Sequence, residues 1–323
     1  MSARALRVGT RASALALWQA RHVEARLAAQ PQAPPVTLVH IRTSGDQQRD
    51  TPLWQSEGRA FFTREIDAAL SAGTIDVAVH SLKDLPTALA PGLTLAATLT
   101  RADPRDALLS RDGAPLKALP PRARIGTSSL RRRAFIARAR PDAVLLELRG
   151  NVPTRIERLR AGDYDAIVLA AAGLGRLGLT QHVTEHLSPQ EFPPAVSQGV
   201  IGVCARAGDA GTLEWLRALD DPQARLAVTA ERALLARLEG GCQVPLGALA
   251  EARGGTLELE AAVCTLDGSR ELRARAMAGA AQGAALTLGD AAVLGERVAE
   301  ELLAAGAAAL IAGERAALTV AAP

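Results

Sequence analysis

Aromatic residues, cysteines and long apolar runs are scarce in this chain, and each scarcity excludes a class of protein. Aromatic side chains make up 2% of the 323 residues, too few for the stacking platforms that bind single-stranded nucleic acids. The three cysteines are far apart without a CxxC pair, so they predict neither a disulfide framework nor a zinc site. No apolar run reaches the roughly 18 residues of a membrane-spanning helix. The first residues lack the apolar core of a signal peptide, so we expect a cytoplasmic protein.

Lysine is scarcer still. Of the 37 basic residues only Lys83 and Lys117 are lysines, and the formal net charge is +3. The basic side chains therefore matter through local clusters and not through bulk charge. Because the chain otherwise uses arginine, a lysine inside the polar turn HSLKDLP indicates a need for an ammonium group, which is smaller and loses its proton more easily.

The densest arginine cluster lies between residues 125 and 155. Thr127 and the two serines after it provide hydroxyl N-caps, so a helix should begin there, and Gly150 and Asn151 lead into a second helix. The free N–H groups at two helix starts favour an anion. Together with guanidinium groups they predict a site for several carboxylates or phosphates. The arginines of this stretch are Arg131, Arg132, Arg133, Arg149 and Arg155.

The first hundred residues alternate between strand and helix patterns. We expect strands at 6–9, 36–41 and 75–79, and helices at 14–29 (with Ser13 as N-cap) and 61–72. This order predicts a parallel sheet whose loops gather at the carboxyl edge of the strands. The polar segment 47–58 is expected to be a mobile loop. Four charged residues fall on the predicted edge: Arg11, Asp46, Lys83 and Asp84.

Residues 106–191 repeat this alternation of strands and helices. The Pro-containing segments 102–106 and 192–195 are expected to pass from one unit to the other, and we call them the crossings. Two similar α/β units with a crossing at each end predict two lobes that face a cleft. After residue 220 the pattern changes to a long helix (222–238), a glycine-rich loop around Cys242, three strand-like segments and a helix near 289–305. This last part predicts a smaller α+β domain.

Several motifs allow a second interpretation. Residues 173–178 match GxGxxG after a strand, as in a dinucleotide site, but no second strand ending in an acidic residue follows. Consecutive arginines splay over different faces of a helix, so Arg133 is expected to be solvated surface and not part of a nucleic-acid patch. His182 and His186 have helical spacing, yet no carboxylate motif supports a metal site. Cys204 and Cys264 lie in apolar runs and are expected in the core.

The cysteine loop allows two interpretations as well. Its glycines and proline would display the Cys242 thiol, whereas an incidental cysteine is equally compatible with the spacing alone.

Seven stretches together resemble one family, hydroxymethylbilane synthase, also called porphobilinogen deaminase. They cover nearly the whole chain in the family's order. These stretches are VGTRASALALWQA (8–20), DVAVHSLKDLPT (76–87), IGTSSLRRRA (125–134), LRGNVPTRI (148–156), DAIVLAAAGLGRLGL (165–179), VSQGVIGVCAR (196–206) and LEGGCQVPLGA (238–248).

The resemblance implies an α/β fold with two lobes like those of type II periplasmic binding proteins, plus a C-terminal α+β domain. It implies lobe 1 at 1–101 and 197–218, lobe 2 at 105–193 and the C-terminal domain at 220–315. It also implies a monomeric transferase, active without a metal, that joins four porphobilinogen units head to tail with loss of ammonia. The product would be the linear tetrapyrrole hydroxymethylbilane, made on a dipyrromethane cofactor.

Site residues follow from the matching motifs. Cys242 corresponds to the cofactor attachment point and Asp84 to the catalytic carboxylate. The positions that resemble cofactor-holding residues are Ser81, Lys83, Thr127, Ser129, Arg131 and Arg132. The positions that resemble substrate-binding residues are Arg11, Ser13, Gln19, Arg149, Arg155 and Arg176.

One stretch departs from the family pattern. Residues 57–62 have fewer glycines than usual, and an arginine replaces a lysine, so the mobility of the loop that should cover the cleft is open. Two rival functions also remain. A non-enzymatic anion-binding protein on the same lobes predicts an unmodified Cys242, and an oxidoreductase using residues 173–178 predicts nicotinamide binding.

Overall fold

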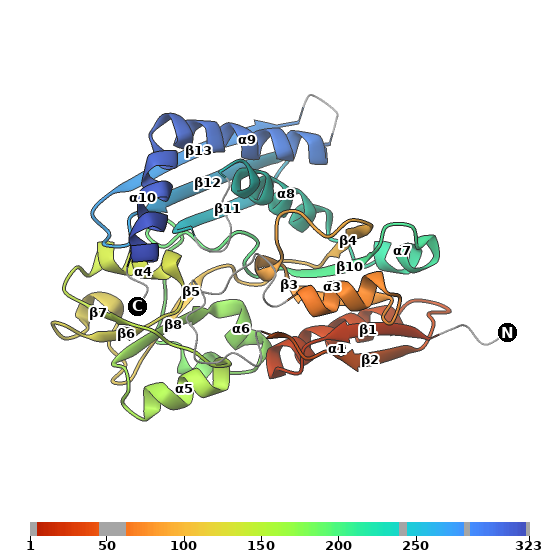
Figure 1. Ribbon diagram of the computed structural model, residues 1–323, viewed down its shortest axis with the longest axis horizontal. Coiled ribbons are helices and arrows are strands. Elements are labelled where there is room, and N and C mark those ends of the chain that lie inside the picture. The colour runs from red at the N-terminus through yellow and green to blue at the C-terminus, as the bar shows by residue number, and fades with distance from the viewer. Residues whose placement is uncertain (1–4, 45–62, 239–243, 281–284, 321–323) are drawn as a thin grey trace.

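The strands of the described residues form three separate sheets, two of five strands and one of three (Figure 1). The computed structural model describes residues 5–44, 63–238, 244–280 and 285–320. Asp46, Cys242, the expected loop at 47–58 and the altered turn at 57–62 lie outside these residues. None of the described helices is long and apolar enough to cross a membrane.

The first sheet combines the N-terminal hundred residues with one later strand. Its elements are β1 (Leu6–Thr10), α1 (Ala14–Ala28), β2 (Val36–His40), α3 (Arg64–Ser71), β3 (Val77–Ser81), the 3-10 turn η2 (Leu82–Asp84), β4 (Leu93–Thr98), β10 (Ile201–Arg206) and α7 (Ala210–Arg217). The order is β2-β1-β3-β10-β4. β1 pairs in parallel with β2 and β3, as predicted, whereas β10 runs antiparallel to both of its neighbours.

The strand expected at 75–79 begins two residues later than predicted. The amides of Thr74 and Ile75 still donate to the carbonyl of Ala69, which closes α3, so the extended conformation starts only at Val77.

The second sheet follows the same plan. Its elements are β5 (Asp106–Ser110), η3 (Leu116–Ala118), β6 (Arg124–Gly126), α4 (Leu130–Ala139), β7 (Val144–Leu146), α5 (Val152–Arg160), β8 (Ala166–Ala170), α6 (Ala171–Arg176), η4 (Thr180–His182) and β9 (Glu185–His186). The order is β7-β6-β8-β5-β9, with β6 parallel to β7 and β8, and β5 antiparallel to β8. The predicted fold class, two similar α/β lobes, is thus confirmed.

Each of these sheets receives its fourth strand through a crossing between the lobes. The crossings lie side by side, because the Ala102 amide donates to Gly199 O (3.1 Å) and the Leu99 amide to Ile201 O (3.0 Å). Gly199 has a φ of +89°, and a Cβ there would lie 2.5 Å from Ala102 O. Only glycine fits this close approach.

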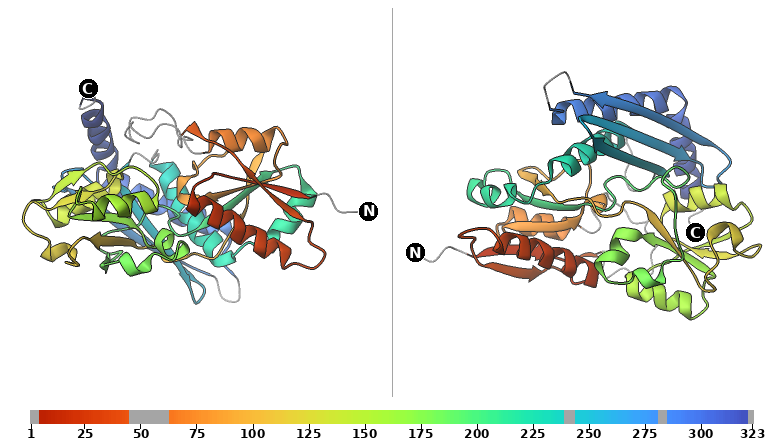
Figure 2. Two further views of the ribbon diagram at one scale, coloured as in Figure 1. Left: turned by 90° about the horizontal axis from the view of Figure 1, so that it is seen from below. Right: turned by 180° about the vertical axis from the view of Figure 1, so that it is seen from behind.

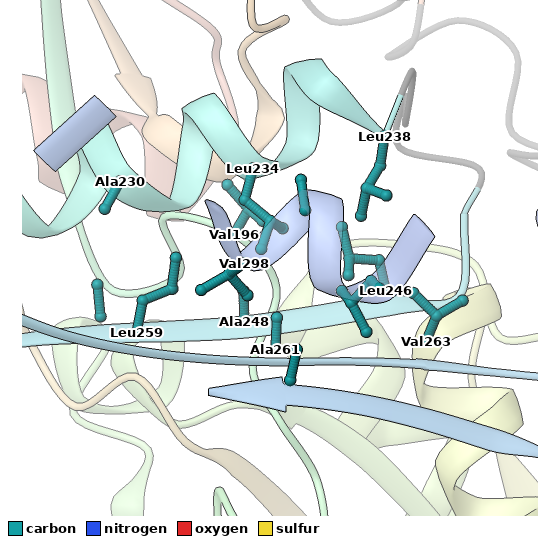
Figure 3. Packing of buried hydrophobic residues seen from close by; sticks show 14 of the residues in the cluster. Val196, Ala230, Leu234, Leu238, Leu246, Ala248, Leu259, Ala261, Val263 and Val298 are labelled. Carbon is teal, nitrogen blue, oxygen red and sulfur yellow. The ribbon is translucent and has the colours of Figure 1, made fainter. Parts of the chain in front are cut away.

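The third sheet belongs to a smaller α+β part at the top of Figure 1. Its elements are α8 (Pro222–Arg237), β11 (Leu246–Arg253), β12 (Thr256–Cys264), β13 (Glu271–Gly279), α9 (Leu288–Ala304) and α10 (Ala307–Val320). The three strands are antiparallel, and α8 and α9 pack on one face of them through a core of small and branched side chains. Figure 3 shows Ala230 and Leu234 of α8 and Val298 of α9 facing Ala248, Leu259 and Ala261 of the sheet.

Local sequence signals explain where most helices begin. Six helices follow a residue whose side-chain oxygen accepts a backbone N–H of the first turn, as an N-cap does. These residues are Ser13, Ser129, Asn151, Asp209, Asp221 and Thr287. The N-caps predicted at Ser13 and before α4 are therefore confirmed.

Two further predictions about single residues are confirmed. Cys204 in β10 and Cys264 in β12 are buried, at 1% and 0% exposure. Arg133 is exposed on α4, while its neighbours Arg131 and Arg132 are buried.

The predicted domain boundaries stay a prediction. The three sheets nevertheless lie in separate parts of the molecule in all views (Figures 1 and 2), and lobe 1 contains both the N-terminal strands and β10.

The third part packs closely on lobe 2 through glycines. A Cβ on Gly247 of β11 would overlap the carbonyl oxygen of Pro193, and one on Gly268 would overlap the backbone of Arg138 at the end of α4. The Ala248 amide also donates to Pro194 O (2.8 Å), so β11 holds the second crossing through its main chain.

We predict that Gly247→Ala destabilises the protein by about 1–3 kcal/mol, because the added methyl group must displace the Pro193 carbonyl. The free energy of unfolding in urea measures this. Gly279→Ala is the matched control, since Gly279 is an exposed residue of β13 with open space at its Cβ position. Equal stability of the two variants would contradict the close packing of β11 on the crossing.

Candidate active site

The turn that follows β3 presents two charged residues beside the crossings. Leu82 and Leu85 are buried, at 0% and 3% exposure, and the Leu82 amide donates to Val200 O (2.9 Å). These two leucines fix η2 in lobe 1. Lys83 and Asp84 between them are only partly buried, so their charged groups are available at the predicted carboxyl edge of the sheet.

Lys83 contacts Gln198 and lies near charged groups of lobe 2. Its Nζ donates to Gln198 Oε1 at 3.2 Å. Its pKa is lowered to about 8, mainly by burial and also by the charges of Arg132 and Arg131, while the charges of Asp84 and Asp106 oppose the decrease. An ammonium with this pKa can still bind an anion at neutral pH, which agrees with the reason for a lysine inferred from the sequence.

A buried ion-pair cluster occupies the start of α4. Asp106 is 1% exposed and binds two guanidinium groups, with 2.8 Å from its Oδ2 to Arg131 Nη2 and 2.8 Å from its Oδ1 to Arg132 Nη2. Burial opposes the ionised carboxyl, yet the two arginines hold the pKa of Asp106 well below its usual range. Arg131 also donates to Pro193 O (2.7 Å) and Arg132 to Val168 O (3.0 Å).

Much of the hydrogen-bonding capacity of these arginines is therefore used within the protein. Arg131 Nε remains buried and without a hydrogen-bond partner among the described residues. Such a donor is costly to bury unless a ligand satisfies it.

Gln198 connects the cluster to lobe 1, and the sequence interpretation did not single it out. It is 1% exposed, accepts from Lys83 and donates through Nε2 to Pro104 O (2.7 Å) and Asp106 Oδ1 (2.9 Å). The sequence feature that could have pointed to Gln198 is its amide side chain inside the apolar stretch VSQGVIGV, because a buried amide requires several specific partners.

Arg155 and Arg149 bring further positive charge from the region where α5 begins. Arg155 Nε donates to Gly150 O (2.7 Å). The pKa of Arg155 is lowered to about 10, mainly by burial and also by the charges of Arg132 and Arg149, while the charges of Glu147 and Asp84 oppose the decrease. Arg132 of α4 and Arg149 therefore lie close enough to Arg155 of α5 for their charges to act on it, and the charge of Asp84 acts on Arg155 as well.

Residues of lobe 1 line the adjoining edge. Gln19 of α1, 2% exposed, donates to Ser81 Oγ (2.8 Å) at the end of β3. Ser13 accepts the Ala16 amide as N-cap of α1, so its hydroxyl oxygen is already engaged. Burial lowers the pKa of His80 to about 4, and the nearby charge of Arg11 contributes, so His80 is neutral at pH 7.

Arg176 joins the lobes from α6. Its Nη2 donates to Gly199 O (2.6 Å), and its guanidinium lies 5.9 Å from the ring centre of Trp18 in α1. Burial lowers the pKa of Arg176 to about 10. The glycines of the GxGxxG match at 173 and 175 lie inside the short helix α6.

Thr127 and Ser129 shape the turn before α4. Thr127 is buried, and its Oγ1 accepts the Ser129 amide (3.2 Å), while Ser129 Oγ accepts the Arg132 amide (3.4 Å). Most of the predicted site residues therefore lie around η2, α4 and α5. Cys242 lies outside the described residues, five positions after the end of α8.

Two family models together match most of the chain. The model described as "Porphobilinogen deaminase, dipyromethane cofactor binding domain" matches residues 6–214, and "Porphobilinogen deaminase, C-terminal domain" matches residues 225–304.

Known proteins similar to the chain cover almost its full length. A porphobilinogen deaminase of Roseiflexus castenholzii is 52% identical over 308 residues, 95% of this chain and 99% of that protein. A porphobilinogen deaminase of Syntrophotalea carbinolica is 46% identical over 312 residues, 97% and 96% of the two chains. Among solved structures, a methionine-bound nutrient binding protein from Burkholderia cenocepacia covers 68% of this chain and 93% of its own, with a TM-score of 0.43 and 16% identity.

We predict that Asp106→Asn costs about 3–5 kcal/mol of unfolding free energy, because it leaves two buried guanidinium groups without a counter-charge. Asp112→Asn should cost less than about 1 kcal/mol, because that side chain is 74% exposed and pairs weakly with Arg111. Urea unfolding of both variants measures the difference. A loss below 1 kcal/mol for Asp106→Asn would show that the cluster does not hold the fold together.

Proposed function

Because the chain belongs to the porphobilinogen deaminase family, we propose that Asp84 is its catalytic carboxylate and that Cys242 carries its dipyrromethane cofactor. The enzyme is a transferase of tetrapyrrole biosynthesis that polymerises porphobilinogen into hydroxymethylbilane. The observation that carries this function is the match of both family models, which together span residues 6–214 and 225–304.

The chemistry of porphobilinogen explains the need for a carboxylate. Loss of ammonia from its aminomethyl group breaks a C–N bond and leaves a pyrrole with positive charge. A new C–C bond to the next pyrrole then forms, and a proton leaves from the carbon that reacted. Asp84 would accept the pyrrole N–H and stabilise the positive charge. Its position supports this role, because Asp84 acts electrostatically on both Lys83 and Arg155.

The basic side chains fit the cofactor. Dipyrromethane carries acetate and propionate carboxylates, and it supplies the pyrrole carbon to which the first substrate unit is joined. Lys83 offers an ammonium, and Arg131 retains a buried Nε without a partner among the described residues. We assign cofactor binding to Ser81, Lys83, Thr127, Ser129, Arg131 and Arg132.

The remaining arginines would hold substrate carboxylates. Arg149 and Arg155 lie close enough for the charge of Arg149 to act on Arg155, and Glu147 and Asp84 are nearby anions. An incoming carboxylate would relieve this repulsion between cations, so binding would gain more here than at an isolated arginine. We assign substrate binding to Arg11, Ser13, Gln19, Arg149, Arg155 and Arg176.

We further propose the three domains 1–101 with 197–218, 105–193 and 220–315, a monomer, and a cytoplasmic location. A reducing compartment supports the use of Cys242, because thioether formation requires a thiol that is not in a disulfide.

Product stoichiometry tests the function. Purified protein incubated with porphobilinogen should release four molecules of ammonia for each hydroxymethylbilane formed. A protein that binds porphobilinogen but releases no ammonia would contradict the function and favour the rival anion-binding protein.

We predict that Asp84→Ala lowers turnover by about 10²–10³-fold, the usual effect of removing one preorganised electrostatic stabiliser. The fold should be retained, since Leu82 and Leu85 anchor the turn. The exposed Asp112→Ala provides the control and should match the wild type. Turnover of Asp84→Ala within a few-fold of wild type would refute the catalytic role.

A further inference from the structure

We propose that Arg232 is a positioning residue that holds the Asp84 turn against α8, the helix that leads to Cys242. The inference rests on the proposed roles of Asp84 and Cys242. The hydrogen bonds that carry it run to the backbone carbonyls of Leu85, Pro86 and Thr87 and not to the Asp84 carboxylate, so the two assignments can be tested separately.

The guanidinium group of Arg232 binds three consecutive carbonyl groups of lobe 1. Its Nη2 donates to Pro86 O (2.5 Å) and Thr87 O (3.1 Å), and its Nη1 donates to Leu85 O (3.4 Å). These carbonyls come directly after Asp84 in the sequence. The planar fork of an arginine suits such a row of acceptors, and a lysine could not bind them in the same way.

The segment that Arg232 holds leaves the lobe 1 sheet. Residues 85–92 connect η2 to β4 without strand pairing, and Pro86 has no amide to donate. Leu85 is the last buried anchor before this connection. A bond from the third part of the molecule therefore fixes the carboxyl-side end of the Asp84 turn, while β3 fixes its other end.

The helix that carries Arg232 is itself firmly placed. Leu234 and Ala230 are fully buried against the third sheet (Figure 3). The neighbouring Glu231, 0% exposed, accepts from Arg101 Nη1 (2.8 Å), from the Ser197 amide (2.6 Å) and from the Ala250 amide (2.8 Å). α8 is thus bound to both crossings and to β11.

The consequence is that the backbone after Asp84 is tied to α8. α8 ends at Arg237, and Cys242 follows five residues later, whereas Arg232 lies five residues before that helix end. One side chain thus links the helix before the cysteine loop to the backbone after Asp84. A small displacement of a catalytic group can cost about 10²-fold in rate, so this link should affect catalysis more than binding.

Arg225 offers a matched control on the same helix. It lies seven residues earlier, on the same face, and also donates to carbonyls of lobe 1, namely Leu95 O (3.0 Å) and Ala96 O (3.0 Å). These carbonyls belong to β4 and not to the Asp84 turn. Arg225 also pairs with Asp220 Oδ1 (2.8 Å). It shares with Arg232 the helix and the binding of lobe 1 carbonyls, but its carbonyl partners lie in β4.

The experiment compares Arg232→Met with Arg225→Met. For Arg232→Met we expect kcat to fall about 10- to 100-fold, with KM within about twofold of wild type. Hydrogen exchange should speed up in the peptide 82–90, a readout that is independent of activity. Arg225→Met should keep kcat within about threefold and show faster exchange at β4. Arg232→Lys should recover only part of kcat, because a single ammonium cannot bind all three carbonyls.

Three results would overturn the proposal: unchanged exchange at 82–90 in Arg232→Met, a kcat within threefold of wild type, or an equal loss of kcat in Arg225→Met. Failure of the proposed role of Asp84 would look different. In that case Asp84→Ala would keep its turnover, while Arg232→Met would still speed up exchange at 82–90.

Discussion

The ion pair of Asp106 with Arg131 and Arg132 is the interaction on which the site depends. It joins the first residue of β5 to the start of α4, and Gln198 extends it to Lys83 in lobe 1. A buried carboxylate stays ionised only with such partners. The cluster therefore keeps two guanidinium groups inside the protein, at a place where they add to the positive charge felt by Lys83.

Excess positive charge near the carboxylate of Asp84 follows from this arrangement. Burial and the charges of Arg132 and Arg149 all lower the pKa of Arg155. The positive groups of the site therefore repel one another. An acidic pyrrole chain relieves that repulsion, and every added unit brings two more carboxylates. The charge of Asp84 acts on both Lys83 and Arg155, which suits the proposed stabilisation of a positive charge formed during coupling.

Local features of the site were predictable from the sequence, and non-local ones were not. The N-caps at Ser13 and Ser129 and the solvated Arg133 follow from neighbouring residues and from helix geometry. The Asp106 pair, by contrast, joins residues 26 positions apart and depends on where the crossing places β5. Gln198 and Arg232 act across more than a hundred residues. α10 was missed because an alanine-rich segment shows no apolar period, although the structure makes it a helix.

The measurement that tests the central claim most directly is the intact mass of the purified, denatured protein, followed by peptide mapping around Cys242. The account predicts extra mass equal to two linked pyrrole units on this cysteine, present on purification or formed after incubation with porphobilinogen. An unmodified Cys242 after that incubation would contradict the account, because the basic cluster would then hold no covalent primer. A modification on Cys204 or Cys264 would also contradict it, since both are buried and burial raises the pKa of each thiol, to about 12 and about 11.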